Sequence, residues 1–151
     1  MMRKDEKGFT LLETVVTAGI AGVLAAVTFP NMSASLNSHR LMAGLRGTAG
    51  CIRTARSAAV MRHVQSQIVL SNGNATLTVQ VNDPVTGWTS IGTPLVLEGG
   101  VTVSSVSPLT TLAFNNTGMA TNNSGGVVTL RTARGDTRVI AVGPLGGVDL
   151  P

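Results

Sequence analysis

One acidic residue, Glu13, stands inside a long apolar stretch near the N-terminus. The stretch from Phe9 to Pro30 has 22 residues, and Glu13 is the only charged one among them. As a helix it would be about 33 Å long, which is enough to cross a bilayer. Burying a carboxylate there costs roughly 2.5–3.5 kcal/mol on insertion scales, so Glu13 predicts a functional contact with a partner. An ammonium group in the same hydrocarbon would offset that cost.

A short basic segment precedes the apolar stretch and ends at Gly8, which is followed by Phe9. Its basic residues are Arg3, Lys4 and Lys7. This pattern resembles the class III signal of type IV pilins and pseudopilins, in which a short basic leader ends in Gly and Glu is fifth after the cut. By this resemblance residues 1–8 are a prepilin leader peptide, and Glu13 has the place of the family's glutamate.

The resemblance implies both processing and assembly. A prepilin peptidase would cleave between Gly8 and Phe9 and methylate the freed amine of Phe9, and Glu13 would pair with the N-terminal amine of a neighbouring subunit. Because the two charges are on different subunits, pairing them offsets the free-energy cost of burying each one. This favours assembly in one register. The alternative is an ordinary signal anchor with a stray Glu, but a leader this short leaves no room for a hydrophobic region before its cleavage site.

The basic residues also predict the orientation in the membrane. Three of them lie in the first eight positions, so the N-terminus is expected to stay cytoplasmic and the chain after Pro30 to be exported into the periplasm. Pro30 removes a backbone donor and would kink or locally unwind the helix, or the span simply ends there. We therefore expect residues 9–30 to be a single inner-membrane span and filament-core helix, and residues 31–151 to be an exported domain.

The first part of that domain, about residues 33–63, has the period of an amphipathic helix. Apolar side chains recur there at spacings of three and four and line one face for packing on a sheet. They are Leu41, Leu45, Ala49, Ile52, Ala55 and Ala59. Gly44, Gly47 and Gly50 are expected on the opposite side, and each costs about 1 kcal/mol relative to Ala. These glycines predict either a locally weak helix or a close approach of neighbouring filament helices.

Over about residues 64–151 the period changes to two, which is typical of strands. Residues 64–70 and 75–81 flank Asn72-Gly73, a pair that predicts a type I′ hairpin. Further strands are expected at residues 94–97, 101–106, 111–114, 127–132 and 137–142. Residues 115–126, rich in Asn, Thr, Ser and Gly, predict a flexible loop. One long helix followed by short strands indicates an α+β domain, with the helix across an antiparallel sheet.

Four short motifs in the exported part resemble the GspH/FimT class of minor pilins and pseudopilins. In chain order they are Ala55–Val60, Gly87-Trp88, Phe114–Gly118 and Val139–Gly146. The resemblance implies a pilin-like fold and a subunit of a type IV pilus or a type II secretion pseudopilus. Its partners would be other pilin or pseudopilin subunits, the prepilin peptidase, the inner-membrane assembly platform and, before assembly, the membrane.

A DNA-binding minor pilin, acting as a receptor in natural transformation, is the alternative. Uptake members of the class carry a Gly-Arg-x-Arg motif whose guanidinium groups contact phosphates, whereas the matching stretch here, residues 146–149, has no arginine. Arg131, Arg134 and Arg138 surround an expected hairpin turn and are the remaining candidates for nucleic-acid contact. A solvated hairpin is the simpler interpretation, so DNA is not the favoured partner. With no Tyr and one Trp, any binding would rest on phosphates.

The remaining reactive residue types do not predict catalysis. His39 and His63 are 24 residues apart, without a carboxylate at triad or metal-ligand spacing, and the single cysteine, Cys51, has neither a disulfide partner nor a CxxC motif. From Phe9 onward the chain has eight arginines, no lysine and five acidic residues, a net charge of +3 that mildly favours acidic surfaces. We expect a protein that is not an enzyme and has no cofactor or metal.

Overall fold

The structure is a computed structural model that describes residues 9–70, 73–107, 111–121 and 125–150. Its elements are α1 (Leu11–Arg62), β1 (Ser66–Leu70), β2 (Thr76–Asp83), β3 (Gly87–Ser90), β4 (Leu95–Val96), β5 (Thr102–Ser107), β6 (Thr111–Phe114), β7 (Gly126–Arg131), β8 (Thr137–Val142) and β9 (Val148–Asp149). The chain divides into two compact units, Met1–Leu36 and Asn37–Pro151, and α1 contributes residues to both.

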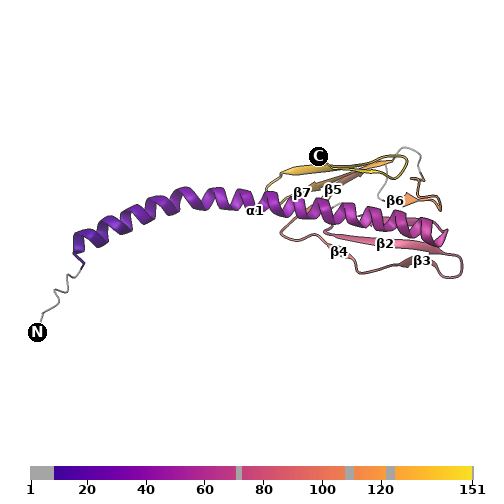
Figure 1. The fold of residues 1–151 in the computed structure, drawn as a ribbon, viewed down its shortest axis with the longest axis horizontal. Helices are drawn as coiled ribbons and strands as arrows, with labels where there is room; N and C mark the ends of the chain where they lie inside the picture. Colours follow the sequence, from indigo (N-terminus) through magenta and orange to yellow (C-terminus); the bar gives the residue numbers. More distant parts are fainter. Residues whose placement is uncertain (1–8, 71–72, 108–110, 122–124, 151) are drawn as a thin grey trace, which may run out of the picture. The chain divides into compact units, whose positions relative to one another are not determined.

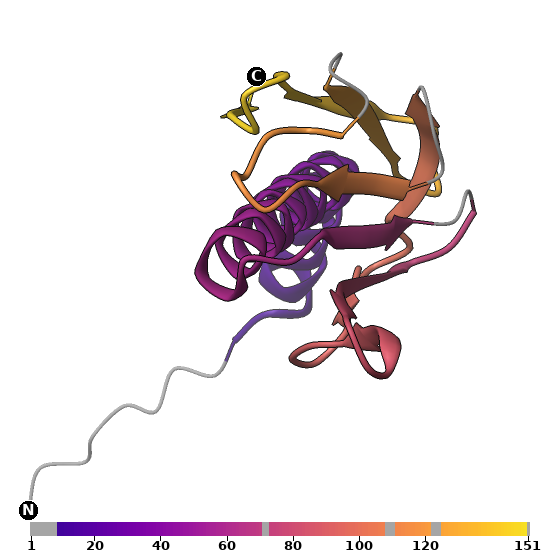
Figure 2. The ribbon, with the colours of Figure 1, turned by 90° about the vertical axis from the view of Figure 1, so that its right-hand side faces the viewer.

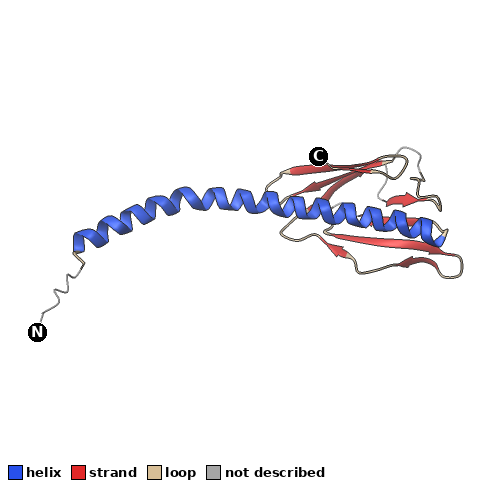
Figure 3. Cartoon of the chain, in the orientation of Figure 1, coloured by secondary structure: helices blue, strands red, loops and turns tan. Residues whose placement is uncertain are grey.

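The helix α1 has 52 residues, and Figure 3 draws it as one uninterrupted element. The helical assignment continues through Pro30, so the local unwinding that the sequence predicted there is wrong. A proline removes one backbone donor, and the hydrogen bonds of the adjacent turns remain. At its C-terminal end, the N–H groups of His63 and Val64 donate to the carbonyls of Val60 and Ala59, at 3.4 and 3.2 Å. This is a Schellman cap, in which His63 takes the left-handed position with φ of 54°.

The strands form two antiparallel sheets in the described part of the chain. One sheet has the order β3-β2-β1-β6, with β4 also paired to β2, and the other has the order β5-β7-β8-β9. The expectation of a single sheet is therefore corrected, while its antiparallel character is confirmed. The division arises because β6 does not pair with the preceding strand β5 but returns to the edge of β1. The edge strands β3 and β9 are additional to the predicted strands.

The connection between β1 and β2 is longer than a type I′ turn. Leu70 pairs with Leu77, so more than two residues lie between the strands and the prediction of a two-residue turn is wrong. Asn72, half of the predicted pair, lies outside the described residues. Gly73 donates its N–H to the carbonyl of Val103 at 2.7 Å. Gly73 is thus bonded to β5, a strand of the other sheet.

The core lies between α1 and the strands of both sheets, which flank the helix in Figures 1 and 2. The six apolar positions predicted for the helix face are all buried, with at most 4% of any residue exposed. They meet fully buried residues of both sheets: Ile68, Leu77, Phe114, Val103, Leu130 and Ile140. Full burial of one Leu or Ile contributes about 1.5–3 kcal/mol, so packing against the helix holds the two sheets together.

Gly44, Gly47 and Gly50 of α1 correct a further expectation. Gly44 is buried, and a Cβ there would lie 3.4 Å from Val101 and 3.5 Å from Leu130. At Gly47 a Cβ would come within 2.9 Å of a methyl group of Leu95. Two of the three glycines therefore face the domain's own strands, and they neither break the helix nor lie opposite its apolar face. Only Gly50 is open among the three, since a Cβ there would have nothing within 4 Å.

Candidate functional site

The N-terminal half of α1 exposes its apolar side chains on all sides. Its large apolar residues between Leu11 and Val27 are 50–82% exposed. Within the described residues, α1 is the helix that is long and apolar enough to cross a membrane, and none of its most apolar window is buried. Soluble monomers rarely expose contiguous apolar surface of this extent. This half of the helix therefore requires lipid or other helices around it.

Glu13 lies in the first turn of that apolar helix. Thr10 precedes the helix, and its Oγ1 accepts a hydrogen bond from the backbone N–H of Glu13 at 3.3 Å. The spacing Thr-x-x-Glu is that of a capping box, and a carboxylate in the first turn is favoured by the positive end of the helix dipole. The structure thus gives Glu13 a local role in addition to the predicted one.

The predicted processing site is next to this turn. Phe9 comes one residue before the capping Thr10 and is exposed, while Gly8 lies outside the described residues. The cleavage after Gly8, the methylation of Phe9 and the pairing of Glu13 with a neighbouring amine stay predictions.

In the second unit, three of the four family-like motifs meet at the side chain of Arg56. Its Nε donates to the carbonyl of Gly118 at 3.1 Å, and its Nη1 donates to the carbonyl of Gly146 at 3.5 Å. Both glycines have left-handed backbones, with φ of 79° and 74°. A Cβ at Gly118 would lie 2.8 Å from a methyl group of Val60. The guanidinium therefore ties α1 to two separate loops, and this contact is structural.

The loop that contains Gly118 is organised by Asn115. The side-chain oxygen of Asn115 accepts hydrogen bonds from the backbone N–H groups of Thr117 and Met119, at 3.0 and 2.9 Å. Ala120 donates its N–H to the carbonyl of Pro144 at 2.9 Å. The prediction of a flexible loop is therefore wrong for residues 115–121, while residues 122–124 lie outside the described part.

The candidate DNA contacts lie around the β7–β8 hairpin. Arg131, Arg134 and Arg138 are all exposed. In the strand register, Arg131 is opposite Thr137, whereas Arg138 is opposite the buried Leu130. Because successive residues of a strand point to opposite faces, Arg131 and Arg138 project from different sides of the hairpin. The three arginines are close in the fold but do not form one flat patch, and their contact with DNA stays a prediction.

The stretch that stands in place of the Gly-Arg-x-Arg motif folds against the end of β8. Gly146 closes a turn by donating its N–H to the carbonyl of Gly143, and Val148 and Asp149 form β9. Asp149 pairs with Ala141 at the edge of the sheet. This edge therefore carries the acidic side chain of Asp149 and no arginine of its own strand β9.

The remaining reactive side chains have structural surroundings. Cys51 is half-buried beside the core, and burial raises the pKa of its thiol, which makes the thiolate less available. His63 caps the helix as described above. Among the residues that the structure describes, no group of three His, Cys, Asp or Glu side chains is arranged to hold a metal ion.

Comparison with known protein families identifies two matching regions. Residues 45–146 match the family described as type II transport protein GspH, and residues 3–29 match the prokaryotic N-terminal methylation motif. A search of curated protein sequences finds no match.

Two solved structures have a similar fold. The type IV minor pilin FimU of Pseudomonas aeruginosa is 15% identical, with a TM-score of 0.64 over 76% of this chain and 90% of that chain. The minor pseudopilin EpsH from the type 2 secretion system of Vibrio cholerae is 10% identical, with a TM-score of 0.61 over 74% of this chain and 96% of that chain. Because the GspH match covers more than half of the sequence and the fold is that of minor pilins and pseudopilins, this chain belongs to the GspH family.

Proposed function

We propose that the chain is a minor pilin or pseudopilin subunit, which inserts into the inner membrane and then assembles into a type IV pilus or a type II secretion pseudopilus. The observation that carries this proposal is the exposed apolar half of α1, whose single charged group is Glu13 in the first turn. Lipid covers this surface before assembly, and the equivalent helices of neighbouring subunits cover it afterwards. In both surroundings Glu13 is the group that requires a partner.

In this proposal the prepilin peptidase acts first, cutting after Gly8 and methylating the amine of Phe9. Phe9 and Thr10 precede the helix and are exposed, so the residue that follows the cut lies outside α1. Intact-mass measurement of membrane-extracted protein should give a chain that starts at methylated Phe9. An N-terminus beyond Pro30, as a conventional signal peptidase would leave, would overturn the proposal.

Assembly is tested by Glu13→Ala, with Thr14→Ala as a control one position along the same helix. The Glu13 variant should be processed and inserted, because the helix becomes more apolar. Its incorporation should fall to a small fraction, since removing one partner of a buried charge pair costs about 3–5 kcal/mol. Immunoblots of sheared filaments and membrane fractions measure both quantities. Equal incorporation of Glu13→Ala and the control would exclude Glu13 as an assembly contact.

The choice between the two filament systems is best made from the neighbouring genes. Both systems share the subunit plan, a secretion ATPase and a secretin. Genes for exported hydrolases next to this one would favour the secretion pseudopilus, and genes for pilus retraction would favour the pilus.

A receptor for DNA is the alternative from another functional class. The arginines of the β7–β8 hairpin project from both of its faces, so few can contact one duplex at a time. We expect no retardation of duplex DNA by the detergent-solubilised chain at physiological salt, apart from weak nonspecific binding. Micromolar binding that is lost in the triple variant Arg131→Ala, Arg134→Ala, Arg138→Ala would instead assign the chain to the uptake class.

A further inference from the structure

The C-terminal half of α1 has an outward face that carries only positive charge. Arg46 and Arg53 are both exposed there and lie seven residues apart. Seven residues are nearly two helical turns, so the two side chains leave the same side of the helix about 10 Å apart. Between Thr14 and Arg62 the helix contains no acidic residue. Within the described part of the chain, neither guanidinium has a hydrogen-bond or ion-pair partner.

The other arginines of this half have contacts inside the domain. Arg56 binds two loop carbonyls. The aliphatic part of the Arg40 side chain lies against Gly99, where an added Cβ would collide with the Cδ of Arg40. The backbone N–H groups of Val85 and Thr86 hold the pKa of the Asp83 carboxyl below its ordinary value, and the positive charge of Arg62 adds to this shift. Arg46 and Arg53 are therefore the arginines of this half of the helix that the domain leaves available.

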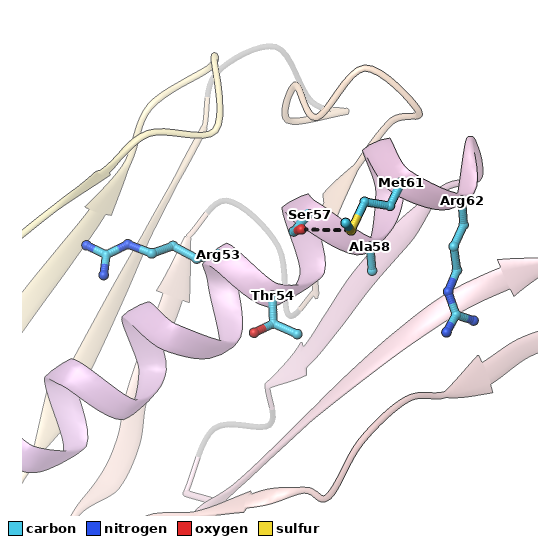
Figure 4. A pocket seen from close by; sticks show the side chains of 6 residues that line it. All are labelled: Arg53, Thr54, Ser57, Ala58, Met61 and Arg62. Carbon is cyan, nitrogen blue, oxygen red and sulfur yellow. Dashed lines mark hydrogen bonds between the residues drawn. The ribbon is translucent and has the colours of Figure 1, made fainter.

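The surface around Arg53 admits another molecule. A shallow depression on the helix is lined by Arg53, Ser57, Ala58 and Met61 among others, and Figure 4 shows the Arg53 side chain extended away from the neighbouring turns. Gly50, between the two arginines in sequence, has open space outside it. A partner can thus reach the guanidinium of Arg53 through this depression, and Arg46 is exposed on the same side of the helix.

We propose that Arg46 and Arg53 form the docking surface for a different pilin-type subunit, one that presents carboxylates at matching positions. This inference rests on the proposed function and adds the chemistry of the partner to it. Guanidinium groups form bidentate hydrogen bonds with carboxylates, and such pairs fix register and exclude wrong partners. The basic surface lies on the part of α1 that belongs to the second unit, after the apolar half in the sequence.

A second copy of this chain does not offer the required carboxylates. Beyond the apolar half, its acidic residues are Asp83, Glu98, Asp136 and Asp149. The Asp83 carboxylate already accepts backbone N–H groups at 2.8 and 3.1 Å. Asp136 lies in the turn of the β7–β8 hairpin, among the arginines there. The remaining two are single charges, and no pair matches the spacing of Arg46 and Arg53.

DNA fits this surface less well than a protein. Two guanidinium groups provide two phosphate contacts, which is well below the 6–10 contacts of strongly salt-dependent binding proteins. The helix also presents no exposed aromatic side chain beside them for stacking on bases. A nuclease-treated sample therefore separates the two kinds of partner.

The absence of lysine after Phe9 allows a sharp test. Arg46→Lys and Arg53→Lys each keep the positive charge and introduce the single side-chain amine of the mature chain. A zero-length carbodiimide reagent then joins that amine to a carboxylate in direct contact, and mass spectrometry of the linked peptide identifies the partner residue. Arg131→Lys, with its amine on the β7–β8 hairpin, is the matched control. The full chain is used, in sheared filaments and in membranes of cells that produce the other pilin-type subunits.

We expect both lysines to link to Asp or Glu of a different pilin-type subunit, several-fold more than the control and regardless of nuclease treatment. In a second experiment, Arg46→Glu with Arg53→Glu should lower incorporation about tenfold or more, because like charges that face each other across an interface repel. Arg131→Glu with Arg138→Glu changes the net charge equally and should incorporate normally.

Three results overturn the inference: links to peptides of a second copy, yields no higher than the control, and cross-links lost on nuclease treatment. If the wild-type chain is present in filaments, these results contradict the inference alone. If the wild-type chain is absent from filaments, the proposed function fails and the inference fails with it.

Discussion

The two halves of α1 differ in what surrounds them, although both are rich in apolar residues. Residues 11–28 expose large apolar side chains around the whole helix, whereas residues 41–62 bury one apolar stripe against the sheets. The second half places four arginines off that stripe, and the first half has a single charge, Glu13. Apolar content therefore does not distinguish a core helix from an assembly helix. The periodic placement of polar residues distinguishes the two kinds of helix.

The most direct test of this difference is to make the same substitution in each half of α1. Ile52 is fully buried, and Ile52→Ala should lower the free energy of unfolding by about 2–5 kcal/mol, because it leaves a cavity. Ile20 is 57% exposed, and Ile20→Ala should change it by less than about 0.5 kcal/mol. Thermal unfolding of the detergent-solubilised chain measures both values. Similar losses would mean that the first half also packs on the domain.

A second pair of variants examines the loop that holds the C-terminal half. Gly118 and Gly73 share a φ of 79°, but only Gly118 has a neighbour, Val60, at 2.8 Å from a Cβ. Gly73→Ala should cost about 1–2 kcal/mol from the left-handed backbone alone. Gly118→Ala should cost about 1–3 kcal/mol more, through the collision with the helix. If both variants unfold at the same temperature, the close contact between Gly118 and Val60 does not contribute to the loss of stability.

The Arg56 contact gives a third, smaller difference within the same helix. Arg56→Ala removes the hydrogen bonds to two loop carbonyls and should destabilise the domain by about 1–3 kcal/mol. Arg53→Ala removes an exposed arginine without an internal partner and should stay within about 0.5 kcal/mol of wild type. Denaturant unfolding of the two variants, read by circular dichroism, compares them. A neutral Arg56→Ala would show that packing alone fixes the loops.

The end of the helix supplies the smallest expected effect, and it is stabilising. His63 occupies the left-handed position of the Schellman cap, where glycine has no Cβ to strain. His63→Gly should therefore raise the free energy of unfolding by about 0.5–1 kcal/mol. The same thermal unfolding measurement detects the rise. A loss of stability would mean that the imidazole contributes contacts that outweigh the strain.

Much of this molecule follows from local sequence patterns. The spacing of Leu41, Leu45 and Ile52 predicted which helix face is buried, because a helix repeats every 3.6 residues whatever it packs against. The strands from β1 to β8, apart from β3, were predicted because side chains in a strand alternate between its two faces. The signal around Phe9 and Glu13 is also local, since the match to the N-terminal methylation motif lies within one continuous stretch, residues 3–29.

What the sequence did not reveal depends on residues that are distant along the chain. The hydrogen bonds from Arg56 join residues separated by 62 and 90 positions, so three motifs that are far apart in the sequence form one contact. The inward faces of Gly44 and Gly47, and the return of β6 to β1, were decided in the same way. Periodicity determines which face of a helix is apolar, but only packing determines which strands lie close enough to require a glycine.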